Sequence, residues 1–344
     1  MNKFVTGTSA FPNADVTLMK GAGIDWVRQD FPFPFTDRIG GELSKHYQEE
    51  RANARNWAAK GFKLMGVSPL PGSGGYKADA GGKMHFHWTS TFPAWAGPVG
   101  SDDYFRAYRQ ACAFLAHDLR GVVQMWQIAN ELDIELFAGP LNPRQGAEMI
   151  LHGAQGLKEA DPSLIVGPNT AGTGAAYYLY GRLYADPHTP LDYCGIDGYY
   201  GSWAEGGPEN WAPRIAELYT LTQKPVLVNE WGFPSRGDVM SEEEVRARNA
   251  GVTACQFRRW PATWGGGHTP EVQAQFVKQT MDGFVAQREK LLGMFFYRWE
   301  DQERCWQCGS PDCPLETAWG LVGVDNTPKP SYNAFKDGVQ RLIG

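Results

Sequence analysis

Two glutamates each follow a short apolar run, the position at which a buried strand presents a side chain at its end. The run Val122–Asn130 leads into Glu131, and the run Val226–Asn229 leads into Glu230. Buried parallel strands read as near-continuous apolar runs, so both acids are expected at the carboxyl ends of such strands. Two carboxylates facing each other across a cleft can cleave a glycosidic bond, because one protonates the leaving oxygen while the other attacks the anomeric carbon.

The strands that would carry these acids belong to a set of eight apolar runs, most of them separated by helical patterns. The runs are Phe4–Thr8, Trp26–Gln29, Lys63–Val67, Val122–Asn130, Leu164–Gly167, Tyr193–Asp197, Val226–Asn229 and Met294–Arg298. Such alternation is typical of a parallel barrel or a doubly wound sheet. A doubly wound sheet would have a glycine-rich phosphate turn after its first strand, and residues 6–10 do not supply one. The sequence therefore predicts an α/β fold, a (β/α)8 TIM barrel, as a single domain over residues 1–344. Extended segments are expected after its third, seventh and eighth strands.

Helices are expected between most of these strands, because capping residues, 3.6-residue apolar periodicity and glycine or proline stops recur there. The expected helices are Val16–Lys20, Tyr47–Ala59, one from Ser101 to before Gly121, Pro143–Ala160, one following Ser241, Pro270–Lys290 and Tyr332–Leu342. A barrel of this kind has its active site at the carboxyl ends of its strands.

Tryptophans are concentrated where that active site is expected. Of the 13 in the chain, ten fall at strand ends or in the segments just after them: Trp88, Trp95, Trp203, Trp211, Trp231, Trp260, Trp264, Trp299, Trp306 and Trp319. Flat indole faces around a polar cleft suit sugar rings, because they cover the apolar face of a pyranose while polar groups bind its hydroxyls. For any one of these residues, anchoring of a loop is the alternative interpretation.

The order of these features resembles the clan A retaining β-glycosidases, a large set of (β/α)8 enzymes. In that clan an Asn-Glu pair ends the fourth strand and supplies the acid/base, and a second glutamate ends the seventh strand as the nucleophile. Asn130-Glu131 follows the fourth predicted strand, and Glu230 follows the seventh. The resemblance thus implies that Glu131 is the acid/base and Glu230 the nucleophile of a glycosidase acting on β-linked oligo- or polysaccharides.

Further positions match the clan and imply substrate-binding roles. Arg28 stands where members often have an arginine under the nucleophile, and Tyr199 matches a strand-six tyrosine that hydrogen-bonds the nucleophile. Trp299 matches the strand-eight tryptophan that forms the floor of the sugar subsite. Residues 320–332 resemble the turn and final helix of the clan. Asp197 departs from the pattern, since many members have histidine two residues before this tyrosine, and it is retained as a substrate-binding candidate.

The long segment after the third strand adds two more candidates for sugar binding, His87 and Trp88. His85 and His87 also form a His-x-His pair that could bind a metal. Barrel metallohydrolases, however, have such a pair on the first strand and add lysine or histidine at strands four to six, which this chain lacks. Contact with a sugar is therefore the preferred interpretation.

Physical chemistry divides the roles of the two acids. Arg28 and Tyr199 would stabilise the anion of Glu230, as a nucleophile requires. Glu131, near that negative charge and walled by aromatic side chains, should have a raised pKa and act as acid and then base. Asn130 would hydrogen-bond the sugar 2-hydroxyl. A retaining mechanism predicts a carboxyl–carboxyl separation of roughly 5–5.5 Å.

The six cysteines fall into two groups. Cys112 and Cys194 lie on a helix stripe and in a strand, where they are expected to be buried and inert. Cys305, Cys308 and Cys313 occupy the segment after the eighth strand, and Cys255 lies in the segment after the seventh. These four could bind a structural zinc ion or form disulfides, and the sequence leaves both open. The catalytic chemistry requires no cofactor in either case.

Composition limits the classes of partner and leaves other properties open. A formal net charge of −6 gives no reason to expect nucleic acid or an anionic membrane. No apolar run reaches the roughly 18 residues of a membrane span, and Met1–Ala10 lacks the apolar region of a signal peptide, which slightly favours the cytoplasm. Two alternative functions are a carbohydrate-binding barrel without turnover and a metal-dependent barrel hydrolase. The sugar, the linkage, exo or endo action and the oligomeric state are not predicted.

Overall fold

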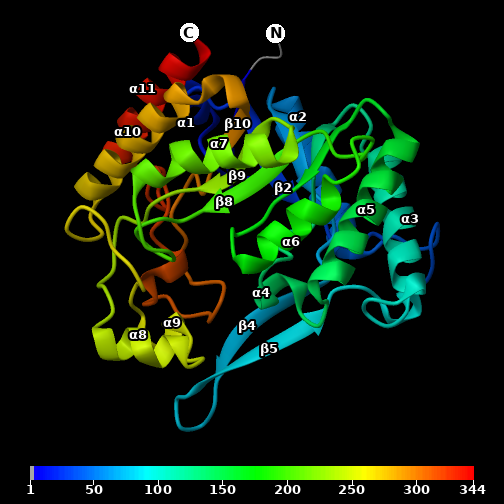
Figure 1. The fold of residues 1–344 in the computed structure, drawn as a ribbon, viewed down its shortest axis with the longest axis horizontal. Helices are drawn as coiled ribbons and strands as arrows, with labels where there is room; N and C mark the ends of the chain where they lie inside the picture. Colours follow the sequence, from blue (N-terminus) through cyan, green and yellow to red (C-terminus); the bar gives the residue numbers. More distant parts are fainter. Residues whose placement is uncertain (1–3) are drawn as a thin grey trace.

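The centre of the computed structural model, which describes residues 4–344, is an eight-stranded parallel sheet rolled into a barrel (Figure 1). Its strands are β1 (Val5–Ser9), β2 (Trp26–Asp30), β3 (Lys63–Val67), β6 (Val123–Ile128), β7 (Ile165–Pro168), β8 (Cys194–Gly198), β9 (Val226–Trp231) and β10 (Leu291–Phe296). Their order in the sheet is β7-β6-β3-β2-β1-β10-β9-β8. The edge strands β7 and β8 meet where the N–H of Asp192 donates to the carbonyl of Val166 at 2.7 Å. The predicted (β/α)8 barrel and all eight of its predicted strands are confirmed.

Helices surround the barrel, and each predicted helix is present. The helices are α1 (Val16–Gly21), α2 (Lys45–Ala59), α3 (Asp102–Asp118), α4 (Glu135–Ala138), α5 (Pro143–Ala160), α6 (Gly174–Leu183), α7 (Trp211–Thr222), α8 (Glu242–Asn249), α9 (Ala254–Phe257), α10 (Pro270–Ala286) and α11 (Pro330–Ile343), with short 3-10 turns at Ala94–Ala96, Pro208–Asn210, Arg288–Lys290 and Pro314–Glu316. Four of these helices, α4, α6, α7 and α9, were not predicted; α4 and α9 are only four residues long, and the N-cap residues of α6 and α7, Thr173 and Asn210, make no side-chain capping bond. No helix among residues 4–344 is both long and apolar enough to span a lipid bilayer.

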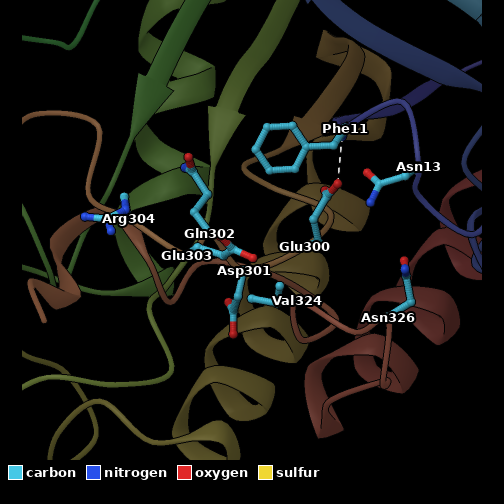
Figure 2. A pocket seen from close by; sticks show the side chains of 9 residues that line it. All are labelled: Phe11, Asn13, Glu300, Asp301, Gln302, Glu303, Arg304, Val324 and Asn326. Carbon is cyan, nitrogen blue, oxygen red and sulfur yellow. Dashed lines mark hydrogen bonds between the residues drawn. The ribbon is translucent and has the colours of Figure 1, made fainter. Parts of the chain in front are cut away.

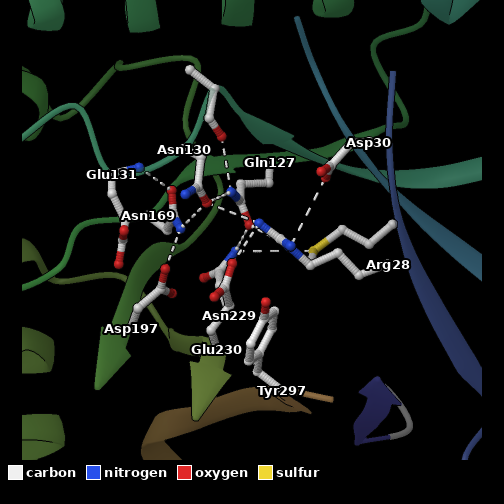
Figure 3. A network of polar contacts seen from close by, with 12 residues as sticks. Arg28, Asp30, Gln127, Asn130, Glu131, Asn169, Asp197, Asn229, Glu230 and Tyr297 are labelled. Atoms are coloured by element: carbon white, nitrogen blue, oxygen red, sulfur yellow. Dashed lines mark hydrogen bonds and ion pairs between the residues drawn. The ribbon is translucent and has the colours of Figure 1, made fainter. Parts of the chain in front are cut away.

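The barrel interior is filled with side chains. The buried cluster consists of Val5, Trp26, Met65, Met125, Tyr193, Leu227 and Phe295. A second and larger apolar layer lies between the sheet and the helices, where the apolar stripes of α3, α5 and α11 are buried. The barrel is therefore a packed core, and its polar side chains gather at the carboxyl ends of the strands (Figure 3).

The extended segment after β3 contains a β-hairpin that the sequence did not predict. Strands β4 (Gly72–Ala78) and β5 (Met84–Ser90) pair antiparallel, from Gly72 with Ser90 to Ala78 with Met84. The hairpin lies at the same end of the molecule as α4, α8 and α9 (Figure 1). Its glycines disfavour strand assignment from propensity. Gly72 is required by packing, because a Cβ there would lie 2.0 Å from the Trp88 indole.

Candidate active site

Glu230 lies in β9 near its carboxyl end, where side chains from two other strand ends contact both carboxylate oxygens. Nη2 of Arg28, from β2, is 2.7 Å from Oε1. The Tyr199 hydroxyl, just after β8, donates to Oε2. Only 10% of the Glu230 side chain is exposed, so solvent screens these interactions little. A guanidinium and a hydroxyl donor both favour the ionised form of a carboxylate.

Arg28 is the centre of the polar network at the strand ends (Figure 3). Its Nε donates to Oε1 of Gln127 at 3.1 Å, and its Nη2 donates to Oδ1 of Asn130 at 2.9 Å. Burial by itself lowers the pKa of this guanidinium, but the negative charges of Glu230 and Asp30 outweigh it, and the pKa lies above its ordinary value. Arg28 is therefore a permanent positive charge beneath Glu230.

Glu131 is held in place by its backbone, just past β6. Ala129 and Glu131 have positive φ angles of 54° and 41°, a region that side-chain-bearing residues seldom adopt. The N–H of Glu131 donates to Oδ1 of Asn169 at 3.0 Å. The carboxylate of Asp133 accepts from the N–H of Thr173 at 3.0 Å, which fixes the next turn of the chain. Strained backbone held by its surroundings is a common property of functional sites.

The pKa values of two carboxyl groups here are strongly raised. Burial is the largest cause for Glu131, followed by the negative charges of Glu230 and Asp133. Burial also dominates the raised pKa of Asp197, followed by the charges of Glu230 and Glu131. Glu131 and Asp197 lie close enough to interact through their carboxyl groups, and Oδ2 of Asp197 accepts from Nδ2 of Asn169 at 2.5 Å. Burial and the nearby negative charges thus favour the protonated forms of Glu131 and Asp197, while Glu230 is paired with Arg28.

Three residues of the network were assigned no role in the predicted site. Gln127 donates from Nε2 to Oδ1 of Asn130 at 2.9 Å, and Nδ2 of Asn229 donates to Oε1 of Gln127 at the same distance. Nδ2 of Asn169 also donates to Oδ1 of Asn130, at 2.8 Å. A buried amide inside an apolar strand needs partners, so Gln127 interrupting the run before Glu131 is the signal that could have identified this network.

Trp299 lies elsewhere than expected. Its side chain is fully buried, and its ring packs 6.0 Å from that of Tyr332 on α11, outside the sheet. The prediction that Trp299 forms the floor of a sugar subsite is therefore wrong. Trp299 lies three residues beyond the end of β10, so the alternation of side chains along that strand does not fix its direction. The aromatic residue from this strand end that lies beside Glu230 is Tyr297 (Figure 3).

The other aromatic candidates divide between core and surface. Five of the ten tryptophans are fully buried anchors: Trp211, Trp231, Trp260, Trp299 and Trp319. Trp95 and Trp306 are exposed. His87 is exposed on β5, while Trp88 is half-buried and lies where a Cβ on Gly139 would collide with it. His87 and Trp88 thus belong to the hairpin, and their contact with a sugar stays a prediction.

Four cysteines converge near this end of the barrel, although two long segments carry them. The Sγ atoms of Cys255, Cys305, Cys308 and Cys313 all lie within 4.8 Å of one another. Cys112 and Cys194 are buried elsewhere, as expected, and burial raises the pKa of both thiols. None of the cysteines in residues 4–344 is in a disulfide.

A hollow of about 340 Å³ lies between the segment after β1 and the segment after β10 (Figure 2). Phe11, Glu300 and Gln302 are among its lining residues, and Oε1 of Glu300 accepts from the N–H of Phe11 at 2.7 Å. Burial raises the pKa of Glu300. Neither predicted catalytic glutamate lines this hollow.

Several solved structures with a similar fold are glycoside hydrolases. A family 39 glycoside hydrolase from Bacteroides cellulosilyticus WH2 has a TM-score of 0.63 at 16% identity, covering 98% of this chain and 64% of that one. A GH5_18 protein from Streptomyces cattleya in complex with GlcNAc has a TM-score of 0.66 at 15% identity, covering 99% and 80%. An exo-β-1,4-mannosidase from Opitutaceae bacterium strain TAV5 has a TM-score of 0.62 at 13% identity, covering 99% and 60%. The chain thus spans under two thirds of the family 39 structure. No protein-family model and no curated protein matches the chain in sequence.

Proposed function

We propose that this protein is a retaining β-glycoside hydrolase with Glu230 as nucleophile and Glu131 as acid/base. The observation that carries the proposal is the contrast between two buried glutamates at the carboxyl ends of β6 and β9. Arg28 and Tyr199 stabilise the anion of Glu230, while burial and nearby negative charge raise the pKa of Glu131. Carboxyl groups whose environments separate their protonation states are suited to the acid and nucleophile roles.

The reaction would proceed in two displacements. In the first, a carboxylate oxygen of Glu230 bonds to the anomeric carbon while Glu131 gives its proton to the departing glycosidic oxygen. In the second, Glu131 takes a proton from water, the water oxygen attacks the anomeric carbon, and the bond to Glu230 breaks. The predicted carboxyl–carboxyl separation of roughly 5–5.5 Å belongs to this mechanism.

Asn130 and Asp197 would contact the sugar bound between the two glutamates. Oδ1 of Asn130 accepts hydrogen bonds from Arg28, Gln127 and Asn169. Its amide nitrogen is therefore the group available to donate to a sugar 2-hydroxyl, a bond that strengthens as positive charge develops on the ring. Asp197, buried beside Glu131, would accept a hydroxyl donor or share the proton of the acid/base.

The substrate class that fits is a β-linked oligo- or polysaccharide. Support comes from the two carboxyl groups at the barrel's strand ends and from the similar structures, one of which is described as an exo-β-1,4-mannosidase. All proton transfers and charge stabilisation in the scheme come from side chains, so we infer that it needs no cofactor. A metal held by the four cysteines would be structural.

The test is covalent trapping with a panel of activated 2-deoxy-2-fluoro β-glycosides, followed by intact mass spectrometry and peptide mapping. A stable adduct on Glu230 is expected, and the sugar that labels fastest identifies the preferred substrate. An adduct on another residue would refute the nucleophile assignment. Failure of every sugar to label, together with no hydrolysis of polysaccharides, would indicate a carbohydrate-binding barrel. Hydrolysis that is abolished by a chelator and gives no adduct would indicate a metal-dependent hydrolase.

A further inference from the structure

The four-cysteine cluster, Cys255, Cys305, Cys308 and Cys313, has the geometry of a single metal centre. The Sγ atoms of Cys255 and Cys305 are 4.0 Å apart, and all four lie within 4.8 Å of one another. In a tetrahedral zinc site with Zn–S bonds of about 2.3 Å, neighbouring sulfurs are separated by about 3.8 Å. Two disulfides would require only pairwise proximity, with each sulfur about 2 Å from one partner. Mutual proximity of all four sulfurs instead fits one central ion.

The chain around Cys305 and Cys308 is shaped for metal binding. The two residues are separated by two others, a common spacing of zinc ligands. Gly309 follows with a φ of 72°, a conformation that glycine permits, and its N–H donates to the carbonyl of Cys305 at 2.7 Å. The resulting tight turn brings both sulfurs to the same side.

Backbone N–H groups favour the thiolate form of three of the cysteines. Those of Cys308, Ser310 and Leu315 lie near Cys305, Cys308 and Cys313, respectively, and each acts to lower the pKa of that thiol. Backbone N–H groups around the sulfurs are typical of metal-bound thiolates, because they offset the negative charge that four thiolates and one divalent cation leave. Three of the four cysteine side chains are buried, and Cys308 is partly exposed, so an ion could enter from that side.

Residues next to the ligands connect the cluster to the hairpin β4–β5. Gln256, beside Cys255, accepts from the N–H of Met84 at 2.8 Å and donates to the carbonyl of Gly82 at 3.2 Å. The carbonyl of Gln307 accepts from the N–H of Tyr76 at 2.8 Å. The hairpin is thus hydrogen-bonded to α9 and to the segment after β10, two parts of the chain that the cluster would join in addition to the ion pair of Arg258 and Asp312, whose charged atoms lie 3.6 Å apart.

A second connection leads toward the proposed nucleophile. Nε2 of Gln307 donates to Oε1 of Glu316 at 2.7 Å, and the Tyr297 hydroxyl donates to Oε2 of Glu316 at 3.3 Å. The ring of Tyr297 lies 5.9 Å from that of Tyr199, whose hydroxyl donates to Glu230. The segment that holds three of the cysteines therefore also supports one wall of the candidate active site.

We propose that Cys255, Cys305, Cys308 and Cys313 bind one structural Zn²⁺ ion, which joins α9, the segment after β10 and the hairpin into one rigid wall of the cleft. Zinc is favoured because four thiolates in a closed tetrahedral arrangement, with no position open for water, are typical of its structural sites. The inference does not depend on the glycosidase chemistry, because its readouts are metal content and local protection.

Metal analysis of the intact protein, purified without chelator, tests the proposal. We expect about one zinc per chain by inductively coupled plasma mass spectrometry. Cys308→Ser should reduce this to a small fraction, whereas Cys112→Ser, which changes a buried cysteine outside the cluster, should retain it. Bound iron would overturn the assignment to zinc. The proposed zinc site would be refuted if the wild-type protein is metal-free and its mass shows disulfides within the cluster. It would also be refuted if Cys308→Ser retains full zinc.

Hydrogen exchange tests the structural role and does not require a variant to fold. After zinc is removed from the wild-type protein with a strong chelator, peptides covering residues 72–90 should exchange at least about tenfold faster, because their anchors lose the crosslink. Peptides covering β2 and β6 should remain protected. Unchanged exchange across the hairpin after confirmed zinc loss would refute the proposed wall.

Discussion

Replacing Glu131 by glutamine is the sharpest test of the proposed chemistry. Glu131 is 7% exposed, and its backbone is fixed by Asn169, so the amide should occupy the same space without moving the neighbouring carboxyl groups. What the variant loses is the proton. General acid catalysis contributes about 100- to 10,000-fold to the rate, so kcat/KM for substrates with poor leaving groups should fall by about that factor. This corresponds to a loss of about 3–5 kcal/mol of transition-state stabilisation.

The loss should depend on the leaving group, and this separates catalysis from misfolding. The dinitrophenolate group of a dinitrophenyl β-glycoside departs without protonation. Glu131→Gln should therefore form the covalent glycosyl-enzyme intermediate from this substrate at nearly the wild-type rate. The second step lacks its base, so the intermediate should accumulate and give a burst of dinitrophenolate. In Glu131→Ala, azide should restore turnover, because an anionic nucleophile needs no base and fits the space left by the side chain.

Stopped-flow measurement of that burst, with Glu135→Gln as control, is the assay. Glu135 lies on α4 with an exposed side chain, and its conversion to glutamine should leave both steps unchanged. An equal loss on activated and unactivated substrates in Glu131→Gln would refute the acid/base assignment. Full activity of Glu131→Gln on both substrates would refute it as well, and would leave Asp197, the neighbouring buried carboxyl group, as the proton donor.

Three other substitutions test the pH dependence, the stability of the network and the placement of the aromatic residues. The charge of Asp133 contributes to the raised pKa of Glu131, whose protonated form is required, so activity should fall as pH rises through that pKa. Asp133→Asn removes this charge and should shift the alkaline limb of the kcat/KM profile to lower pH. A shift to higher pH would contradict the assignment. Arg28→Met leaves the buried carboxylate of Glu230 unpaired and should lower the free energy of unfolding in urea by about 3–5 kcal/mol. The control Arg144→Met breaks an exposed ion pair on α5 and should lower that free energy by under about 1 kcal/mol. Similar losses in the two variants would refute the structural role of Arg28. Trp299→Phe should lower the unfolding free energy by about 1–3 kcal/mol through lost packing while KM is retained, and a raised KM in the folded variant would place the indole in the cleft after all.

The sequence was sufficient for the barrel and for the position of both glutamates. Apolar runs such as Val226–Asn229 are local patterns, and the end of a parallel strand is a place that topology alone defines. Cap signals such as Ser101 and the Ser241 capping box placed helices for the same reason, because their hydrogen bonds join residues close in sequence. Helices α6 and α7 were missed, because Thr173 and Asn210 have no Glu or Gln three residues later to complete a capping box.

The tertiary structure decided what depends on contacts between distant segments. Trp299 lies beyond the end of β10, and its buried position depends on packing against Tyr332 of α11, a residue 33 positions away. The hairpin β4–β5 is glycine-rich, and partners such as Gln256 and Gln307, far away in sequence, hold it in place. Similarly, Cys255 and Cys305 are separated by 50 positions, yet their sulfurs lie 4.0 Å apart. Periodicity reports which residues share a face of one element, but only the packed chain determines which faces meet.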